Sequence, residues 1–325
     1  MKRFFKYLSI PIIMAVVAIT IVVFVTISEQ AQKSPSIIYV GKTSDTSIEF
    51  WGSIHSGMET AETETGIEVR KYSSPDEQDA QTQIQIMERC ISKNPDVIIL
   101  VPSDVARLVP ITKKAVESGI PVITLDSHLN YDKIKSEIST NNIEAGKKAG
   151  DALCQHLEQG SKVAIISHIQ TASTAIEREK GARLALESKE LQIVDTAYCE
   201  GSEELAYQNT LRIIEQNPDL AGIVALNEVT ALGSARAITD VGLAGKIKLV
   251  GFDSSKAEIQ LIENGTICAT VVQRPFNMGY LAVMSAIEIA NGKSVPSQID
   301  TGSVTVTKDN MYGAEIQKLI FPFGE

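Results

Sequence analysis

Five polar side chains that can pair with the hydrogen-bonding groups of a ligand each follow an apolar run of strand length. They are Lys42, Asp126, Asn227, Asp253 and Gln273. Carboxylate and amide groups pair with neighbouring donors and acceptors, and an ammonium group donates up to three hydrogen bonds. In open α/β sheets a ligand binds beyond the carboxyl ends of the strands. The positions of these side chains therefore predict a polar ligand-binding site.

The sequence shows no pattern typical of catalysis or of a bound cofactor. No G-x-G-x-x-G motif follows a strand, and the four histidines are scattered without a nucleophile beside a base. The four cysteines, Cys90, Cys154, Cys199 and Cys268, have neither metal-site nor disulfide-framework spacing. Buried free thiols are the expected state. We predict a binding protein without metal or cofactor, and no enzyme activity.

Apolar strand-length runs alternate with segments of helical periodicity along most of the chain. The predicted strands are Ile37–Val40, Ile67–Tyr72, Asp96–Val101, Ile120–Leu125, Lys162–Ser167, Leu191–Tyr198, Ala221–Leu226, Ile247–Phe252 and Thr266–Val272. Predicted helices include those near Val105–Ser118, Ile143–Glu158, Ala175–Ser188, Glu203–Gln216 and Val229–Val241. Apolar strands separated by amphipathic helices favour parallel sheets covered on both faces. Because these units exceed one sheet, the fold class is α/β with two doubly wound parallel-sheet lobes.

The N-terminus predicts a membrane helix ahead of the lobes. Lys2, Arg3 and Lys6 precede an uncharged, mainly apolar run from Leu8 to Ile27. Twenty helical residues span roughly 30 Å, the thickness of the hydrocarbon core. Residues 1–28 are thus an anchor or, alternatively, a long cleaved signal, and residues 29–35 are a stalk. Since the basic residues stay cytoplasmic, the remainder is extracytoplasmic, tethered unless the helix is cleaved.

Bulk composition narrows the classes of partner. The 325 residues carry a formal net charge of −10, with 44% hydrophobic and 22% charged residues. A chain that tracks nucleic acid needs a basic face, so a nucleic-acid partner is excluded. The composition is that of an ordinary globular protein, and we expect a monomer.

Eight segments, taken in order, resemble the periplasmic sugar-binding proteins of fold type I, the ribose/galactose type that serves ABC transporters. They are FWGSIHSG (50–57), VIILVPSD (97–104), GIPVITLDS (119–127), STNNIEAGKKAG (139–150), AIEREKGARLAL (175–186), ALNEVTALGSARAI (225–238), LVGFDSS (249–255) and ATVVQRPFNMG (269–279). The resemblance covers about Ile37 to Lys308. Each segment alone is weak, whereas eight in order at fitting spacings are specific.

This resemblance implies two lobes joined by a hinge that the chain crosses three times. The first lobe would comprise residues 36–140 plus 274–302, and the second residues 141–273 plus 303–325. The crossings would fall near Asn141, near Gln273–Arg274 and near Gly302–Ser303. Ligand binding would favour the closed state of the hinged pair.

The resemblance also implies roles for eight residues. Asp126, Asn227, Asp253 and Gln273 match polar ligand contacts, and Lys42 is a further candidate. Arg178 matches an arginine that reaches in from the second lobe, and Phe50 and Trp51 match an aromatic pair that covers the sugar ring.

Each role has a structural alternative. Asp126 and Asp253 at strand ends, and Asn227 before a helix, could serve as helix caps. Arg178 lies in the charged run EREK, which is commonly a solvated face. Gln273 could serve only the hinge, Phe50 could belong to the core, and Lys42 could be a surface lysine.

Departures from ribose binders bear on the ligand. Ser127 stands where they carry an arginine, Ile48 where they carry an asparagine, and Gly201 near the position of an aromatic, for which Tyr198 and Glu200 are neighbouring substitutes. Ribose is therefore not the expected ligand. Two carboxylates with one guanidinium favour a small neutral carbohydrate or polyol over an anion, because unpaired buried charge is costly.

Four functions compete on the sequence. The first is delivery of the bound sugar to an ABC-type import permease, which is our prediction. The alternative is a ligand sensor that presents its closed form to a membrane histidine kinase. A transcriptional regulator of the same fold is disfavoured, because a membrane span stands where a DNA-binding headpiece should. An enzyme is disfavoured by the missing motifs described above.

Overall fold

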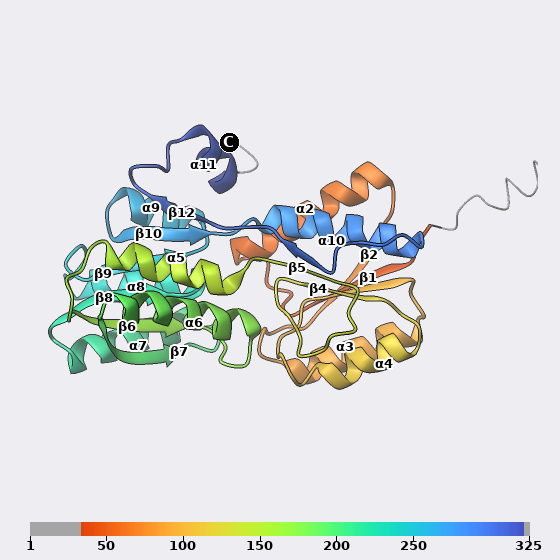
Figure 1. Cartoon of the computed structure of the whole chain (residues 1–325), viewed down its shortest axis with the longest axis horizontal. Coiled ribbons are helices and arrows are strands. Elements are labelled where there is room, and N and C mark those ends of the chain that lie inside the picture. Colours follow the sequence, from red (N-terminus) through yellow and green to blue (C-terminus); the bar gives the residue numbers. More distant parts are fainter. Residues whose placement is uncertain (1–33, 322–325) are drawn as a thin grey trace, which may run out of the picture. The chain divides into compact units, whose positions relative to one another are not determined.

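The computed structural model describes residues 34–321, which form two six-stranded sheets. The first sheet, in spatial order, consists of β11 (Gln298–Asp300), β5 (Ser136–Ser139), β4 (Val122–Leu125), β3 (Val97–Leu100), β1 (Ile37–Gly41) and β2 (Val69–Ser73). The second consists of β12 (Val304–Thr307), β10 (Ile267–Val272), β9 (Lys248–Phe252), β8 (Leu220–Ala225), β6 (Lys162–Ser167) and β7 (Gln192–Tyr198). Figure 1 shows the sheets in two lobes.

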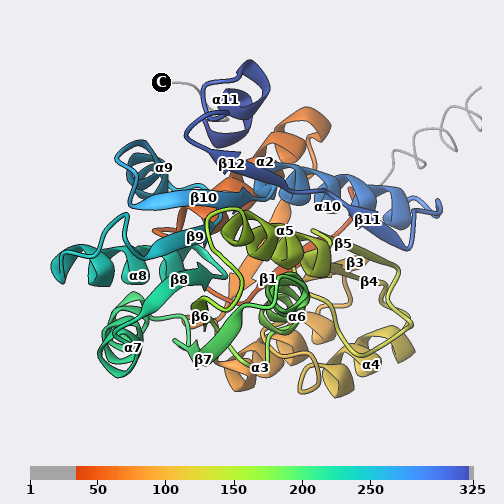
Figure 2. The ribbon, with the colours of Figure 1, turned by 60° about the vertical axis from the view of Figure 1, so that its left-hand side comes forward.

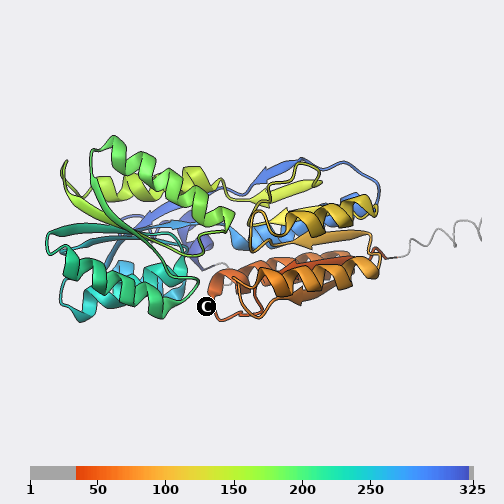
Figure 3. The same ribbon diagram turned by 90° about the horizontal axis from the view of Figure 1, so that it is seen from below.

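Helices cover both faces of each sheet. They are α2 (Glu49–Thr65), α3 (Ala80–Ser92), α4 (Val109–Glu117), α5 (Asn142–Cys154), α6 (Ser173–Ser188), α7 (Glu203–Gln216), α8 (Glu228–Asp240), α9 (Lys256–Glu263), α10 (Pro275–Ala290) and α11 (Ala314–Ile320). In the view from below, the second sheet lies between α5 and α6 on one side and α7 and α8 on the other (Figure 3). The two-lobe α/β fold expected from the alternating pattern is thereby present.

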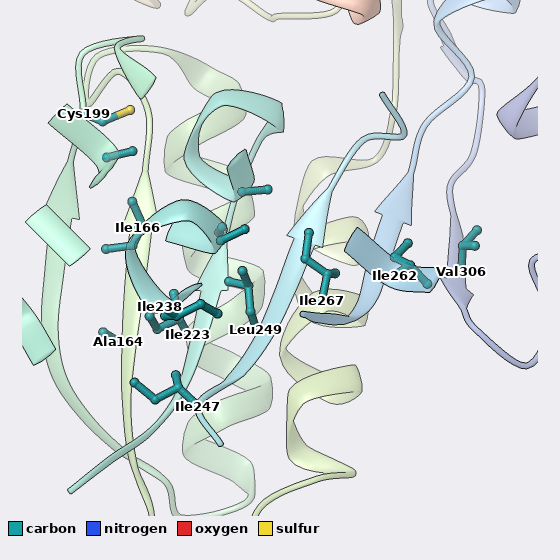
Figure 4. Close-up of a cluster of buried hydrophobic side chains, with 14 of the residues drawn as sticks. Ala164, Ile166, Cys199, Ile223, Ile238, Ile247, Leu249, Ile262, Ile267 and Val306 are labelled. Carbon is teal, nitrogen blue, oxygen red and sulfur yellow. The ribbon is translucent and has the colours of Figure 1, made fainter. Parts of the chain in front are cut away.

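The strands bury alternate residues on opposite faces, which is why they read as continuous apolar runs. In β1, Ile37 and Tyr39 belong to one buried cluster, whereas Ile38 and Val40 belong to another. The second sheet divides in the same way; Figure 4 shows the cluster that contains Ala164 and Ile166. Each sheet is thus the middle layer of its lobe, and its strand ends are held by two cores.

The chain passes between the sheets three times. It does so between β5 and α5, between β10 and α10, and between β11 and β12. Every neighbouring pair of strands is parallel except β12, which runs antiparallel to β10. The exception to the predicted parallel sheets has a simple cause. The carboxyl ends of the strands in both lobes face one cleft, so a chain that leaves β11 and continues into the second lobe must run against its strands.

Two pairs of helices approach each other so closely that their backbones touch. In the first lobe, a Cβ atom on Gly57 of α2 would lie 2.0 Å from the carbonyl oxygen of Phe276, and one on Gly279 of α10 would lie 2.0 Å from that of Ile54. In the second lobe, Gly181 of α6 meets the carbonyl of Ile143 in α5 in the same way. Figure 2 shows α10 beside α2. Only glycine fits at these crossings, which fix α2 and α6 against their lobes.

Several element boundaries differ from those predicted. The helix predicted near Val105–Ser118 begins at Val109, because the Asp104 carboxylate accepts hydrogen bonds from the amides of Ala106 and Arg107 and holds the preceding residues in turns. The short strands β5, β11 and β12 were not predicted. The predicted span Leu8–Ile27 lies outside the described residues, and between residues 34 and 321 no helix is long and apolar enough to cross a bilayer.

Candidate ligand-binding site

All eight residues singled out in the sequence line one cavity of about 220 Å³, which we call the inner cavity. They are Lys42, Phe50, Trp51, Asp126, Arg178, Asn227, Asp253 and Gln273. They follow strands of both sheets, lie on α2 and α6, or directly precede α8. Ile48 and Gly201, two of the positions at which the chain departs from ribose binders, line it as well.

The first-lobe wall of the cavity is built around a buried ion pair. The Lys42 ammonium lies 2.9 Å from Oδ2 of Asp126, and the two side chains are 4% and 3% exposed. Ser127 completes the group, because its hydroxyl donates to the same carboxylate oxygen at 2.9 Å and accepts from Lys42 at 3.2 Å. Lys42 is therefore no surface lysine, and Asp126 caps no helix in this structure.

The aromatic pair lies next to this ion pair. The rings of Phe50 and Trp51 meet edge to face with centroids 4.9 Å apart, and the Lys42 ammonium lies 5.0 Å from the Trp51 ring centroid. Both rings also belong to the core of the first lobe. Phe50 is thus part of the core and of the cavity wall at once, because the edge of the first-lobe core forms this part of the wall.

The first-lobe wall contains three carboxylates that sequence reasoning missed, Asp45, Asp76 and Glu77. Glu77, half-buried after β2, accepts a hydrogen bond from Nε1 of Trp51 at 2.5 Å. Burial raises the pKa of Glu77, while Lys42 acts in the opposite direction. The rule that places ligand groups after strand ends finds Glu77 once it is applied to the strand predicted at Ile67–Tyr72.

In the second-lobe wall, the charged side chains are hydrogen-bonded to neutral groups. Arg178 is 3% exposed; its Nε donates to Asn142 at 2.8 Å and its Nη1 to the carbonyl of Leu226 at 2.9 Å. Its guanidinium stacks 4.0 Å from the ring centroid of Phe252, and burial lowers its pKa. The EREK run is therefore no uniform solvated face, because Arg178 turns inward whereas Lys180 is exposed.

Asp253 has the same backbone setting as Asp126 with different partners. Both adopt positive φ, 63° for Asp126 and 79° for Asp253, and both donate their amides to a neighbouring strand. The Asp253 carboxylate accepts from Nε2 of Gln273 at 2.7 Å and from the amide of Glu228 at 3.2 Å. Burial raises the pKa of Asp253, and Arg178 acts in the opposite direction.

Asn227 caps α8, which is the alternative role that its place before a helix predicted. Its side-chain oxygen accepts from the amide of Thr230 at 3.1 Å, and its own backbone amide donates to the Thr230 hydroxyl at 2.9 Å. Its side-chain NH2 is not used by the cap, so capping and ligand contact are compatible. Tyr198 does not line the inner cavity: its hydroxyl donates to Glu179 instead.

Two sets of contacts join the lobes. In the first, the amide of His128 donates to the Ser173 hydroxyl at 2.9 Å, and Nδ1 of His128 lies 3.3 Å from the Glu177 carboxylate. In the second, the Glu228 carboxylate accepts from the amides of Glu49 and Phe50 at 3.4 Å each. Burial and the nearby Asp253 raise the pKa of Glu228 to about 7. The lobes are therefore in contact across the cavity.

A further ionisable side chain, His168, lies in the wall of the inner cavity. It is bonded through Nε2 to the Thr174 hydroxyl at 2.9 Å, and burial lowers its pKa well below the usual value. Residues 34–321 contain no group of three or more histidine, cysteine, aspartate or glutamate side chains that could hold a metal ion. All four cysteines are free thiols.

Comparison with known proteins identifies relatives along most of the chain. A family described as "Periplasmic binding protein domain" matches residues 37–294. A D-ribose/D-allose-binding protein of Pseudomonas aeruginosa is 27% identical over 233 residues, which are 69% of this chain and 72% of the relative.

Solved structures with the same fold carry bound sugars. A carbohydrate transporter solute-binding protein from Agrobacterium radiobacter, in complex with D-arabinose, aligns with a TM-score of 0.84 and 28% identity over 89% of this chain and 100% of the other. An ABC transporter solute-binding protein from Agrobacterium vitis with bound D-fucose aligns with a TM-score of 0.84 and 32% identity over 88% of this chain and 99% of the other.

Proposed function

This chain belongs to the periplasmic binding protein family, and from that membership we propose that it binds a small neutral sugar or polyol between its lobes and delivers it to an ABC-type import permease. One observation carries the proposal. Hydrogen-bonding groups from both lobes and two aromatic rings converge on one cavity of about 220 Å³. Hydroxyl groups pair with carboxylates, amides and guanidinium, and an aromatic ring covers the CH face of a sugar.

The relatives support transport over signalling. The P. aeruginosa relative is named for sugar binding, and both solved structures are named as transporter components. These names favour delivery to a permease over presentation to a histidine kinase, and they favour binding over enzymatic turnover. No feature of the described residues favours the sensor.

The remaining parts of the proposal rest on the sequence. The family places the globular part outside the cytoplasm, and we infer that the N-terminal run tethers it there as a monomer unless it is cleaved. The lobes are assigned as residues 36–140 plus 274–302 and residues 141–273 plus 303–325. The eight residues of the inner cavity are assigned as the ligand contacts.

A thermal-shift screen of the full chain tests the binding step. The protein should be purified in a detergent without a sugar headgroup and heated with D-ribose, D-allose, D-arabinose, D-fucose, other polyols and small anions. A ligand at about 100 times its Kd stabilises the fold by roughly 2.7 kcal/mol, so the correct sugar raises the melting temperature measurably. A shift with anions alone would contradict the proposal.

A further inference from the structure

A second and larger cavity lies beside the inner one. This outer cavity has a volume of about 820 Å³ and is lined by residues at the starts of α2, α9 and α10 and by α11. Drug-sized ligands occupy pockets of about 300–1,000 Å³. The inner cavity falls below that range, whereas the outer cavity lies within it. The two spaces together exceed what one sugar ring requires.

The two cavities share part of their walls. Phe50, Glu228, Asp253 and Gln273 line both. Beside these residues, the amides of Glu49 and Phe50 donate across the lobes to Glu228, over 3.4 Å each. The amide of Lys256 donates to the Glu49 carboxylate at 3.1 Å. Backbone N–H groups in proteins usually donate over 2.7–3.2 Å. The two hydrogen bonds to Glu228, which lines both cavities, are thus longer than usual.

An unused hydrogen-bond acceptor lies at this boundary. Gln273 is 2% exposed and donates through Nε2 to Asp253, while its Oε1 has no hydrogen-bond partner among the described residues. Buried polar atoms are nearly always paired, so each exception calls for an explanation. A donor group of a ligand that extends through the boundary would satisfy this oxygen.

The lining of the outer cavity suits a second ring. Phe276, Leu319 and Phe321 supply apolar surface, and Glu49, Asn277 and Lys318 supply groups that pair with hydroxyls. A combination of ring-covering apolar surface and a few polar groups is typical of sites for amphipathic rings. Because the lining contains both acidic and basic side chains, it favours no particular ligand charge.

We propose that the natural ligand is a two-ring glycoside, with one sugar ring in the inner cavity, the second ring in the outer cavity, and the linkage beside Gln273. The proposal rests on the proposed function, since the first ring uses the same eight contacts. It extends that function from monosaccharides to disaccharides and aryl glycosides. Ser53 of α2 lines the outer cavity without lining the inner one, which makes it the residue to alter.

The test compares one-ring and two-ring ligands by isothermal titration calorimetry on the full chain. The probes are the free monosaccharides of the screen above, the disaccharides that contain them, and their 4-nitrophenyl glycosides in both anomers. Ser53→Trp places an indole in the outer cavity and takes up part of its volume, and Asn277→Trp does so from α10 in case the first variant does not fold. The matched control is Ser56→Trp, on the same helix and outside both cavities.

We expect at least one two-ring ligand to bind as tightly as its parent monosaccharide or more tightly. The tryptophan in the outer cavity should weaken the binding of that ligand at least about tenfold and leave the affinity for the monosaccharide within about twofold. Ser56→Trp should leave both affinities unchanged. If monosaccharides bind and no two-ring ligand does, the inference is wrong and the proposed function stands. Equal two-ring affinity in the filled variants would also overturn it, and the absence of any sugar binding would remove both.

Discussion

The two walls of the inner cavity share a backbone arrangement and differ in how they neutralise charge. Asp126 and Asp253 each follow a strand with positive φ. In the first lobe, Asp126 is ion-paired with Lys42. In the second lobe, Asp253 is held by the amide groups of Gln273 and Glu228. We therefore expect the carboxylate of the first wall to contribute mainly to the stability of the fold. We expect the carboxylate of the second wall, which has only neutral hydrogen-bond partners, to contribute mainly to ligand affinity.

Removing Asp126 should have the largest effect. Asp126→Ala leaves the Lys42 ammonium buried without its partner, which costs about 3–5 kcal/mol of unfolding free energy in buried pairs. Urea denaturation of the ligand-free chain measures it. The double variant Lys42→Met/Asp126→Leu should recover most of the stability and none of the sugar binding. If Asp253→Ala destabilises the ligand-free chain as much as Asp126→Ala, the contrast between the walls is wrong.

The second wall should make stability depend on pH through Glu228. Its pKa rises from 4.5 to about 7 in the folded chain, so the folded state holds the proton more tightly than the unfolded state. The resulting stabilisation is complete below about pH 4.5 and is lost as the pH rises through 7. A shift of this size corresponds to roughly 3 kcal/mol.

Glu228→Gln isolates this contribution, because it keeps the side-chain shape and cannot ionise. The unfolding free energy of the natural chain minus that of the variant should fall between pH 4.5 and 7.5, as measured by urea denaturation at each pH. A difference that stays constant over this range would show that the pKa of Glu228 is the same in the folded and unfolded states. The Glu228 carboxylate would then be better solvated than its burial indicates.

Asp253→Asn should separate ligand affinity from stability. The substitution removes a buried carboxylate whose pKa is raised by burial. Without ligand, the variant should therefore be at least as stable at pH 8 as the natural chain. Sugar affinity should fall about 10–100-fold, since hydrogen bonds to a charged group contribute about 1.5–3 kcal/mol. Calorimetry and thermal denaturation on the same sample give both numbers. Unchanged affinity would remove Asp253 from the ligand contacts.

The smallest effect is expected where the lobes meet at the surface. His128 and Glu177 lie 3.3 Å apart, and each is 27% exposed. Such partly exposed pairs contribute about 0–1 kcal/mol, so Glu177→Gln should weaken sugar binding at most about fivefold. Titration calorimetry at pH 6 measures it, with Glu187→Gln on the same helix as the control. A larger loss would mean that this contact, rather than the cavity walls, controls closure.

The sequence predicted the fold well because its strands are buried on both faces. Val97–Leu100 is fully buried and is apolar throughout, which leaves a local signal. β11 and β12 have only three and four residues and are mostly half-buried or exposed, so their formation depends on neighbouring strands that local patterns do not reveal.

Side chains of the site were predictable where they directly follow an apolar strand. Asp126 and Asp253 do so, and the structure brings them to one cavity. Glu77 lies four positions beyond the end of β2, so its place in the cavity wall depends on the path of the loop and not on the strand alone. The capping role of Asn227 was foreseeable from its place before a helix. The ion pair between Lys42 and Asp126, 84 positions apart, depends on tertiary structure alone.

The backbone contacts between helices have a consequence for redesign of the protein. α2 carries the aromatic pair and α6 carries Arg178, and each is locked to its neighbour through glycines that admit no side chain. Variation at the ends of the strands can therefore change which molecule is bound while the frame that presents those residues stays constant. A library for new specificities should randomise the loops after β1, β2, β4 and β9 and leave Gly57, Gly279 and Gly181 untouched.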